Sequence, residues 1–149
     1  MSTESTDSAT RNLLVFGLEG ALFGVDASDV DAVVSWTEPV PLPRGGTAVL
    51  GVVQDRGRIV SVLRHPSGAE RSGDDEPRRI VICRTRSGLL GLPASSTRAI
   101  APVAIFGEVI PGGVVDTGAG TLTYIVPDAI ADRIAGPRHA REDAALEGT

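Results

Sequence analysis

The sequence predicts an all-β protein made of two small barrels, followed by a short helix near the C-terminal end. Aromatic residues are scarce, at 3% of the 149 residues, so the core has to come from Val, Ile, Leu and Ala. Eighteen glycines and ten prolines favour short strands and tight turns. Apolar runs of strand length recur between these turn signals, a pattern typical of β sandwiches and barrels.

The first half of the chain contains about five such runs. Leu13–Leu18 and Leu22–Val25 flank the turn signal Glu19-Gly20, which predicts a β hairpin. The other apolar runs of this half are Val30–Trp36, Ala48–Val53 and Arg58–Leu63.

The second half offers a similar set of about five. Its apolar runs are Ile80–Cys83, Leu89–Leu92, Thr97–Ile100, Val103–Val109 and Leu122–Val126. Asp128 then precedes a segment with Ile130 and Ile134 four residues apart, which predicts a short terminal helix with Asp128 as its N-cap.

A polar segment separates the two halves. Residues 65–77 are rich in Gly, Pro, Ser and acids, so they are expected to form a linker between a first subdomain at about 12–64 and a second at about 78–135. Residues 1–11 and 136–149 are polar and are expected to be tails without fixed structure.

Composition excludes several classes of protein. A formal net charge of −5, without a basic stripe, argues against a nucleic-acid partner. Cys83 is the only cysteine, so no intramolecular disulfide can form and a cytoplasmic location is expected. No apolar run approaches the roughly 18 residues of a membrane span, so no membrane insertion is expected.

The spacing of the His, Asp and Cys residues does not match a known catalytic or cofactor-binding pattern. His65 and His139 fall in the linker and the tail, away from acids on strands. Asp26, Asp29 and Asp31 lack the Gly and closing Glu of a calcium loop. Cys83, in an apolar run, is expected to act as a small hydrophobe. We therefore expect no catalytic residue, no metal site and no cofactor.

One polar tetrad, Gln54-Asp55-Arg56-Gly57, lies between two apolar strands, with Gly51 shortly before it. Read with the preceding segments, it resembles the first subdomain of the CheW family of chemotaxis coupling proteins. The matching pieces, in the family's order, are Leu14-Val15-Phe16, Gly24-Val25-Asp26, Val30, Val33, Gly51-Val52 and Arg56-Gly57. The second half matches more loosely, through Ile80–Cys83, Leu89–Leu92 and Tyr124–Asp128.

The resemblance implies two intertwined five-stranded SH3-like barrels and a non-catalytic adaptor. Such an adaptor bridges the cytoplasmic tip of a chemoreceptor and the regulatory domain of a CheA-type histidine kinase, in chemosensory clusters at the membrane or in the cytoplasm. The residues that the resemblance makes candidates for partner binding are Val30, Val33, Leu50, Gly51, Asp55, Arg56 and Gly57. Gly51 and Gly57 also have a structural interpretation, a positive φ or a close backbone approach.

The sequence departs from the family pattern at several positions. Ala32 stands where the family carries Glu, and Asp55 where it carries an apolar Leu. An unpaired charge is costly in a dry interface, so Asp55 should either face solvent or require a cation on the partner. We therefore expect kinase binding to be weakened. Two alternatives remain: an accessory protein that binds only receptor or only one kinase, and a small-ligand-binding barrel or enzyme subunit.

Overall fold

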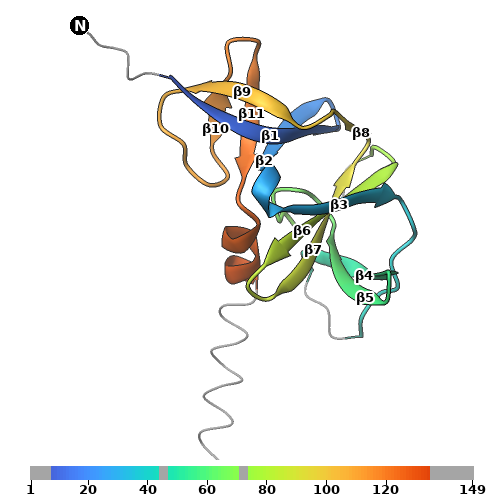
Figure 1. Cartoon of the computed structure of the whole chain (residues 1–149). Coiled ribbons are helices and arrows are strands. Elements are labelled where there is room, and N and C mark those ends of the chain that lie inside the picture. The colour runs from blue at the N-terminus through green and yellow to red at the C-terminus, as the bar shows by residue number, and fades with distance from the viewer. Residues whose placement is uncertain (1–7, 44–46, 71–73, 135–149) are drawn as a thin grey trace, which may run out of the picture.

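The computed structural model describes residues 8–43, 47–70 and 74–134, and almost all of its regular structure is β (Figure 1). The strands form two sheets, which confirms the predicted fold class. Residues 1–7, 44–46, 71–73 and 135–149 are outside this description, so the expectations for most of the two tails and part of the linker lie there too.

The terminal sheet takes strands from both ends of the described chain. Its order is β2-β11-β10-β9-β1-β8, with an additional pairing of β1 with β2. The strands are β1 (Ser8–Leu18), β2 (Ala21–Asp26), β8 (Ser96–Thr97), β9 (Ala101–Phe106), β10 (Val114–Asp116) and β11 (Thr121–Ile125).

The central sheet is built from the intervening part of the chain in the order β3-β6-β7-β5-β4. The 3-10 turn η2 (Ala27–Asp29) leads into it from β2. Its strands are β3 (Val30–Ser35), β4 (Val49–Asp55), β5 (Arg58–Leu63), β6 (Arg79–Thr85) and β7 (Gly88–Ala94).

The sequence located most strands but not the division between the sheets. The Glu19-Gly20 hairpin is confirmed, with Leu18 paired to Ala21. The two sheets do not follow the expected halves at 12–64 and 78–135, because β6 and β7 pair with β3 and β5 of the first half. The terminal sheet also has six strands rather than five, since β10 lies in a stretch for which no strand was expected.

The first strand begins earlier than the sequence indicates. Residues 8–11 were expected to belong to a tail, but Ser8–Leu13 pair antiparallel with Ala101–Phe106 of β9. Arg11 also donates to the Asp26 carboxylate at 3.2 Å and to the Tyr124 hydroxyl at 3.1 Å. Backbone hydrogen bonds to β9 hold this polar segment in the sheet, so its composition did not reveal that it is ordered as a strand.

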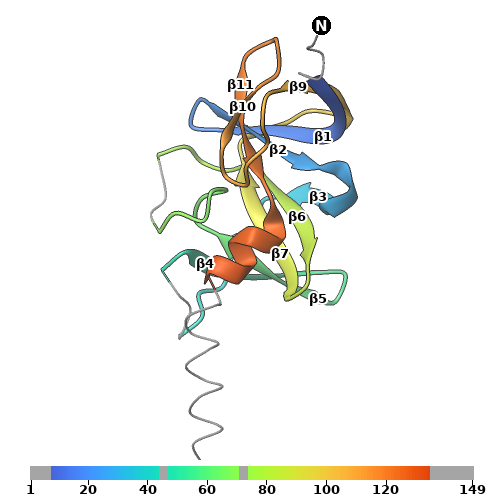
Figure 2. The same cartoon turned by 90° about the vertical axis from the view of Figure 1, so that its left-hand side faces the viewer.

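Residues 127–134 are helical, in agreement with the predicted terminal helix. Both views place this helix below the terminal sheet and beside the central one (Figures 1 and 2). Ile130 is buried and Ile134 packs against the same cluster. Asp128 lies in the first turn, and its carboxylate accepts a hydrogen bond from the Arg86 backbone N–H at 2.8 Å, instead of acting as the predicted N-cap.

Buried side chains form three clusters. Each sheet encloses one cluster on its inner face, and the third lies between the two sheets. In β1, Leu13 and Val15 point into the terminal sheet while Leu14 and Phe16 point towards the central sheet. In β6, Ile80 and Ile82 point into the central sheet, whereas Val81 and Cys83 join the cluster between the sheets. Successive side chains of a strand point to opposite faces, so both strands read as continuous apolar runs.

Among the described residues, no helix has the length and apolar character required to cross a membrane.

Candidate functional site

The turn between β4 and β5 presents the polar tetrad that the sequence singled out. Arg56 and Gly57 have φ angles of 52° and 79°, both in the left-handed region. Two such residues in a two-residue loop match the twist of the strands that it joins, as in a type I′ hairpin. Glycine adopts this geometry easily, whereas Arg56 bears the Cβ strain. The structural interpretation of Gly57 is thus supported.

Side chains of this turn meet Asp31 of β3. The Asp31 carboxylate lies 2.6 Å from the Arg58 guanidinium and 3.2 Å from that of Arg56. Arg84 of β6 approaches the same carboxylate at 3.3 Å. Asp55 in turn lies 3.1 Å from Arg56 and 3.0 Å from Arg58. We call Asp31, Asp55, Arg56, Arg58 and Arg84 the arginine–aspartate cluster.

Hydrogen bonds keep both acids of the cluster ionised. The bonds that Arg58 donates are the main reason that the pKa of Asp31 and the pKa of Asp55 lie below their ordinary value. The same bonds raise the pKa of Arg58 further. At neutral pH the cluster therefore holds three guanidinium groups and two carboxylates.

The cations of the cluster face outward and the acids lie beneath them. The side chain of Arg56 is 65% exposed, whereas those of Asp31 and Asp55 are 13% and 15% exposed. Arg84 is exposed as well. Guanidinium groups held in this way can donate to carbonyl or carboxylate oxygens of another protein.

Asp55 does not require a cation from a partner, contrary to one of the two outcomes that the sequence suggested. Arg56 and Arg58 of its own chain supply the positive charge. A third option, pairing within the chain, was missed because it depends on how the hairpin folds back on itself.

The other candidate residues do not all gather at this cluster. Val30 packs against the cluster between the sheets, and Val33 is partly exposed at 37%. Leu50 and Gly51 lie at the beginning of β4, whereas Asp55 ends it, about 13 to 17 Å away at the usual rise of a strand. The candidates therefore belong to two separate places on the central sheet.

Gly51 has a clear structural role. A Cβ at this position would lie 2.4 Å from the carbonyl oxygen of Val40, and Val40 exchanges backbone hydrogen bonds with Val52 at 2.8 and 2.9 Å. The chain passes so close that only glycine fits, which favours packing over partner contact at this position.

Sequence reasoning missed Arg58 and Arg84 as members of the site. Arg58 could have been found, because it follows the turn and faces Asp55 across the hairpin. Arg84 is 53 positions from Asp31, and nothing local in the sequence indicates that the two meet.

Two other potentially reactive side chains among the described residues, Cys83 and His65, are buried or partly buried. Burial raises the pKa of the Cys83 thiol to about 12, so the nucleophilic thiolate is scarce. Burial also lowers the pKa of His65, which contacts Ser67. In the ranges 8–43, 47–70 and 74–134, no group of three His, Cys, Asp or Glu side chains is placed to hold a metal ion. His139 lies outside these ranges.

Two closely packed small sheets and a short terminal helix define the class of fold, a protein of small β barrels. Comparison with known families gives a match to the CheW-like domain over residues 12–106, and the chain belongs to this family. The match spans most of both sheets, including the whole arginine–aspartate cluster.

A solved structure agrees with this assignment. The scaffolding protein TtCheW from Thermoanaerobacter tengcongensis has a similar fold, with a TM-score of 0.65 and 21% sequence identity. The similarity covers 82% of this chain and 92% of that one. The fold is that of two SH3-like barrels followed by a short helix. No curated protein matches the sequence.

Proposed function

We propose that this protein is a non-catalytic, cytoplasmic adaptor that couples a chemoreceptor to a CheA-type histidine kinase in a bacterial chemosensory system. The observation that carries the proposal is the CheW-like domain match over residues 12–106. Proteins of this family act as scaffolds, so their function lies in the surfaces that they present to partners.

The arginine–aspartate cluster is the surface that we assign to the receptor. Arg56 projects from a two-residue turn, and its side chain is positioned by Asp31 and Asp55. Positioning a long side chain in advance reduces the conformational entropy lost on binding. The guanidinium can then donate to carbonyl or carboxylate oxygens of the cytoplasmic tip of the receptor.

The kinase contact is expected to be the weaker of the two. Charged groups of the cluster occupy a place where the family has an apolar Leu, and removing paired charges from water is still costly. One compensation is present: Asp31 carries a carboxylate next to Ala32, where the family acid is missing, and it faces Arg56. We expect calorimetry with the kinase regulatory domain to give an affinity weaker than micromolar; a sub-micromolar value would contradict this.

Affinity purification from the native cell tests the adaptor function. We expect both a chemoreceptor and a CheA-type kinase among the proteins retained. Retention of only one of them would indicate an accessory protein with a single partner. Retention of neither would contradict the proposal and favour the small-ligand-binding barrel.

A point variant tests the assigned surface. Arg56→Ala should weaken receptor binding about tenfold, equivalent to about 1.4 kcal/mol. Because Arg56 is exposed and Arg58 still pairs with both acids, unfolding stability should change by no more than about 0.5 kcal/mol. Arg98→Ala is the control, since Arg98 is exposed on the side of the terminal sheet. Unchanged binding together with a large stability loss would make Arg56 a structural residue.

A further inference from the structure

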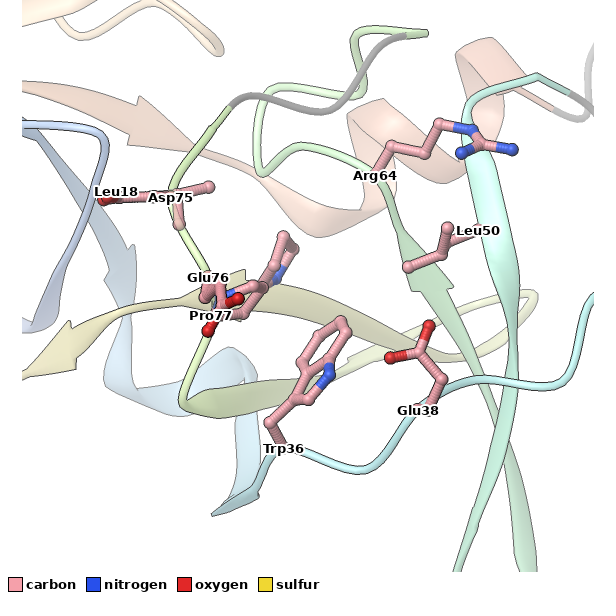
Figure 3. A pocket seen from close by; sticks show the side chains of 9 residues that line it. Leu18, Trp36, Glu38, Leu50, Arg64, Asp75, Glu76 and Pro77 are labelled. Carbon is pink, nitrogen blue, oxygen red and sulfur yellow. The ribbon is translucent and has the colours of Figure 1, made fainter.

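A second feature of the central sheet lies at the other end of β4. It is an open cavity of about 450 Å³, within the size range of ligand-binding pockets (Figure 3). Trp36, Leu50 and two prolines supply apolar walls, and Leu18 at the tip of the first hairpin closes one side. Its polar lining consists of Glu38, Arg64, Asp75 and Glu76.

Trp36 is held in place by the sheet and presents part of its ring to the cavity. Its backbone N–H donates to the carbonyl of Arg78 at 3.0 Å, which fixes the chain as it leaves β3. The indole is half-buried, because it packs partly against the cluster inside the central sheet. Figure 3 shows the ring between Pro77 and Glu38, with the Glu38 carboxylate on the side of the indole nitrogen.

The cavity has an excess of negative charge. Glu38 and Glu76 bring two carboxyl groups, and Asp75 brings a third that is turned towards the first hairpin, whereas Arg64 is the one cation among the described lining residues. In the part of the chain that the structure describes, none of these three acids forms an ion pair with an arginine or histidine. Arg64 is directed elsewhere, donating to the Thr47 carbonyl at 2.7 Å.

The acids come from two segments that the fold brings together. Asp75 and Glu76 belong to the linker, and Glu38 follows β3. Asp75 ties the linker to the first hairpin, because its carboxylate accepts a bond from the Glu19 backbone N–H at 2.5 Å. An indole wall with carboxylates around it suits a guanidinium, which stacks on aromatic faces and bonds carboxylates along its edge.

We propose that this cavity binds an arginine side chain carried by an extended segment of a partner protein. The inference rests on the proposed function as a protein-binding adaptor, and it assigns the chemistry of a second docking point. The arginine–aspartate cluster, at the other end of β4, exposes cations. A partner that used both places would therefore present an acidic or carbonyl-rich element to one and an arginine to the other.

The sole tryptophan of the chain makes the test direct, because Trp36 is itself a wall of the cavity. Full-length protein is titrated with the peptide acetyl-Gly-Ala-Arg-Ala-Gly-amide while Trp36 fluorescence and the indole N–H resonance are followed. The same peptide with citrulline in place of arginine keeps the shape and removes the charge. We expect saturable binding of the arginine peptide at about millimolar affinity, and at least about tenfold weaker binding of the citrulline peptide.

Variants test the acids. The double variant Glu38→Gln with Glu76→Gln keeps the size of both side chains and should lower affinity for the arginine peptide about tenfold. Glu108→Gln is the matched control, because Glu108 is an exposed acid in the loop after β9 and does not line the cavity. Equal binding of the two peptides, or an unaffected double variant, would overturn the proposal.

Two further measurements exclude other occupants. If Arg138→Gln with Arg141→Gln shifts the indole resonance without peptide, the cavity is filled by the C-terminal segment of this chain and the proposal fails. An indole resonance that moves with protein concentration would indicate a second copy and would also overturn it. These outcomes differ from failure of the adaptor function, which affinity purification reports independently.

Discussion

The two sheets differ in how the chain supplies them. All strands of the central sheet come from residues 30–94, one continuous stretch. The terminal sheet joins residues 8–26 to residues 96–125, so its strands meet only when the two ends of the fold come together. Closing such a long loop costs entropy before the contacts form. The terminal sheet therefore depends on apolar contacts with the central sheet.

These contacts are made in the buried cluster between the sheets. It combines Phe16 and Phe23 from the terminal sheet with Leu63, Val81 and Leu92 from the central one. Because the sheets share this cluster, we expect them to unfold in one transition although their strands are supplied so differently.

The largest effect is expected from a residue in this shared cluster. Phe16 is 1% exposed, with its ring 5.4 Å from that of Phe23, so Phe16→Ala should lower the free energy of unfolding by about 3–5 kcal/mol. Urea unfolding measures it. Phe106→Ala is the control, since Phe106 is 42% exposed and should cost much less. Equal losses, or separate transitions for the two sheets, would show that the shared cluster does not join them.

Shortening the first strand tests the terminal sheet alone. Removing residues 1–11 deletes the pairing of Ser8–Arg11 with β9 and the Arg11 contacts to Asp26 and Tyr124. Several net hydrogen bonds of about 1 kcal/mol each should cost about 2–3 kcal/mol, seen as a lower Tm. Removing residues 1–7 takes away no described contact and serves as the control. An unchanged Tm after the longer deletion would mean that β1 needs only its later residues.

Gly51→Ala tests close packing within the central sheet. The new Cβ would meet the Val40 carbonyl oxygen at 2.4 Å, so backbone has to move. We expect a loss of about 2 kcal/mol, typical of overpacking. Gln54→Ala, an exposed position on the same strand, should be nearly neutral. If the glycine variant is equally stable but binds partners poorly, Gly51 is a contact residue instead.

The smallest effect concerns acid and the arginine–aspartate cluster. Folding lowers the pKa of Asp31 and of Asp55, so their contribution to stability is full above the ordinary value near 3.8 and is lost as pH falls through the lower folded values. Between pH 5 and 2, wild type should therefore lose more stability than Asp31→Asn. Asp74→Asn, which alters an exposed linker acid, should follow wild type. If the free energy of unfolding of all three proteins falls equally with pH, the cluster does not contribute to the loss of stability in acid.

Local patterns were enough to predict the fold class, the first hairpin and the strands of the central sheet. Turn residues such as Glu19-Gly20 and apolar runs of strand length involve only a few neighbouring positions, so they can be read without the rest of the molecule. The short pairings were harder: β10 has three residues, and β9 holds the polar start of β1 by backbone hydrogen bonds that composition does not reveal.

The amino-acid sequence was sufficient to assign the family and to locate Arg56 in a turn between two strands. Tertiary structure alone decided that Asp31 meets Arg84, that Asp55 is neutralised within its own chain, and that Trp36 faces acids of the linker. The physical reason is distance along the chain. Strand propensity and turn chemistry are local, whereas the partners of a charged side chain depend on which segments the buried clusters bring together.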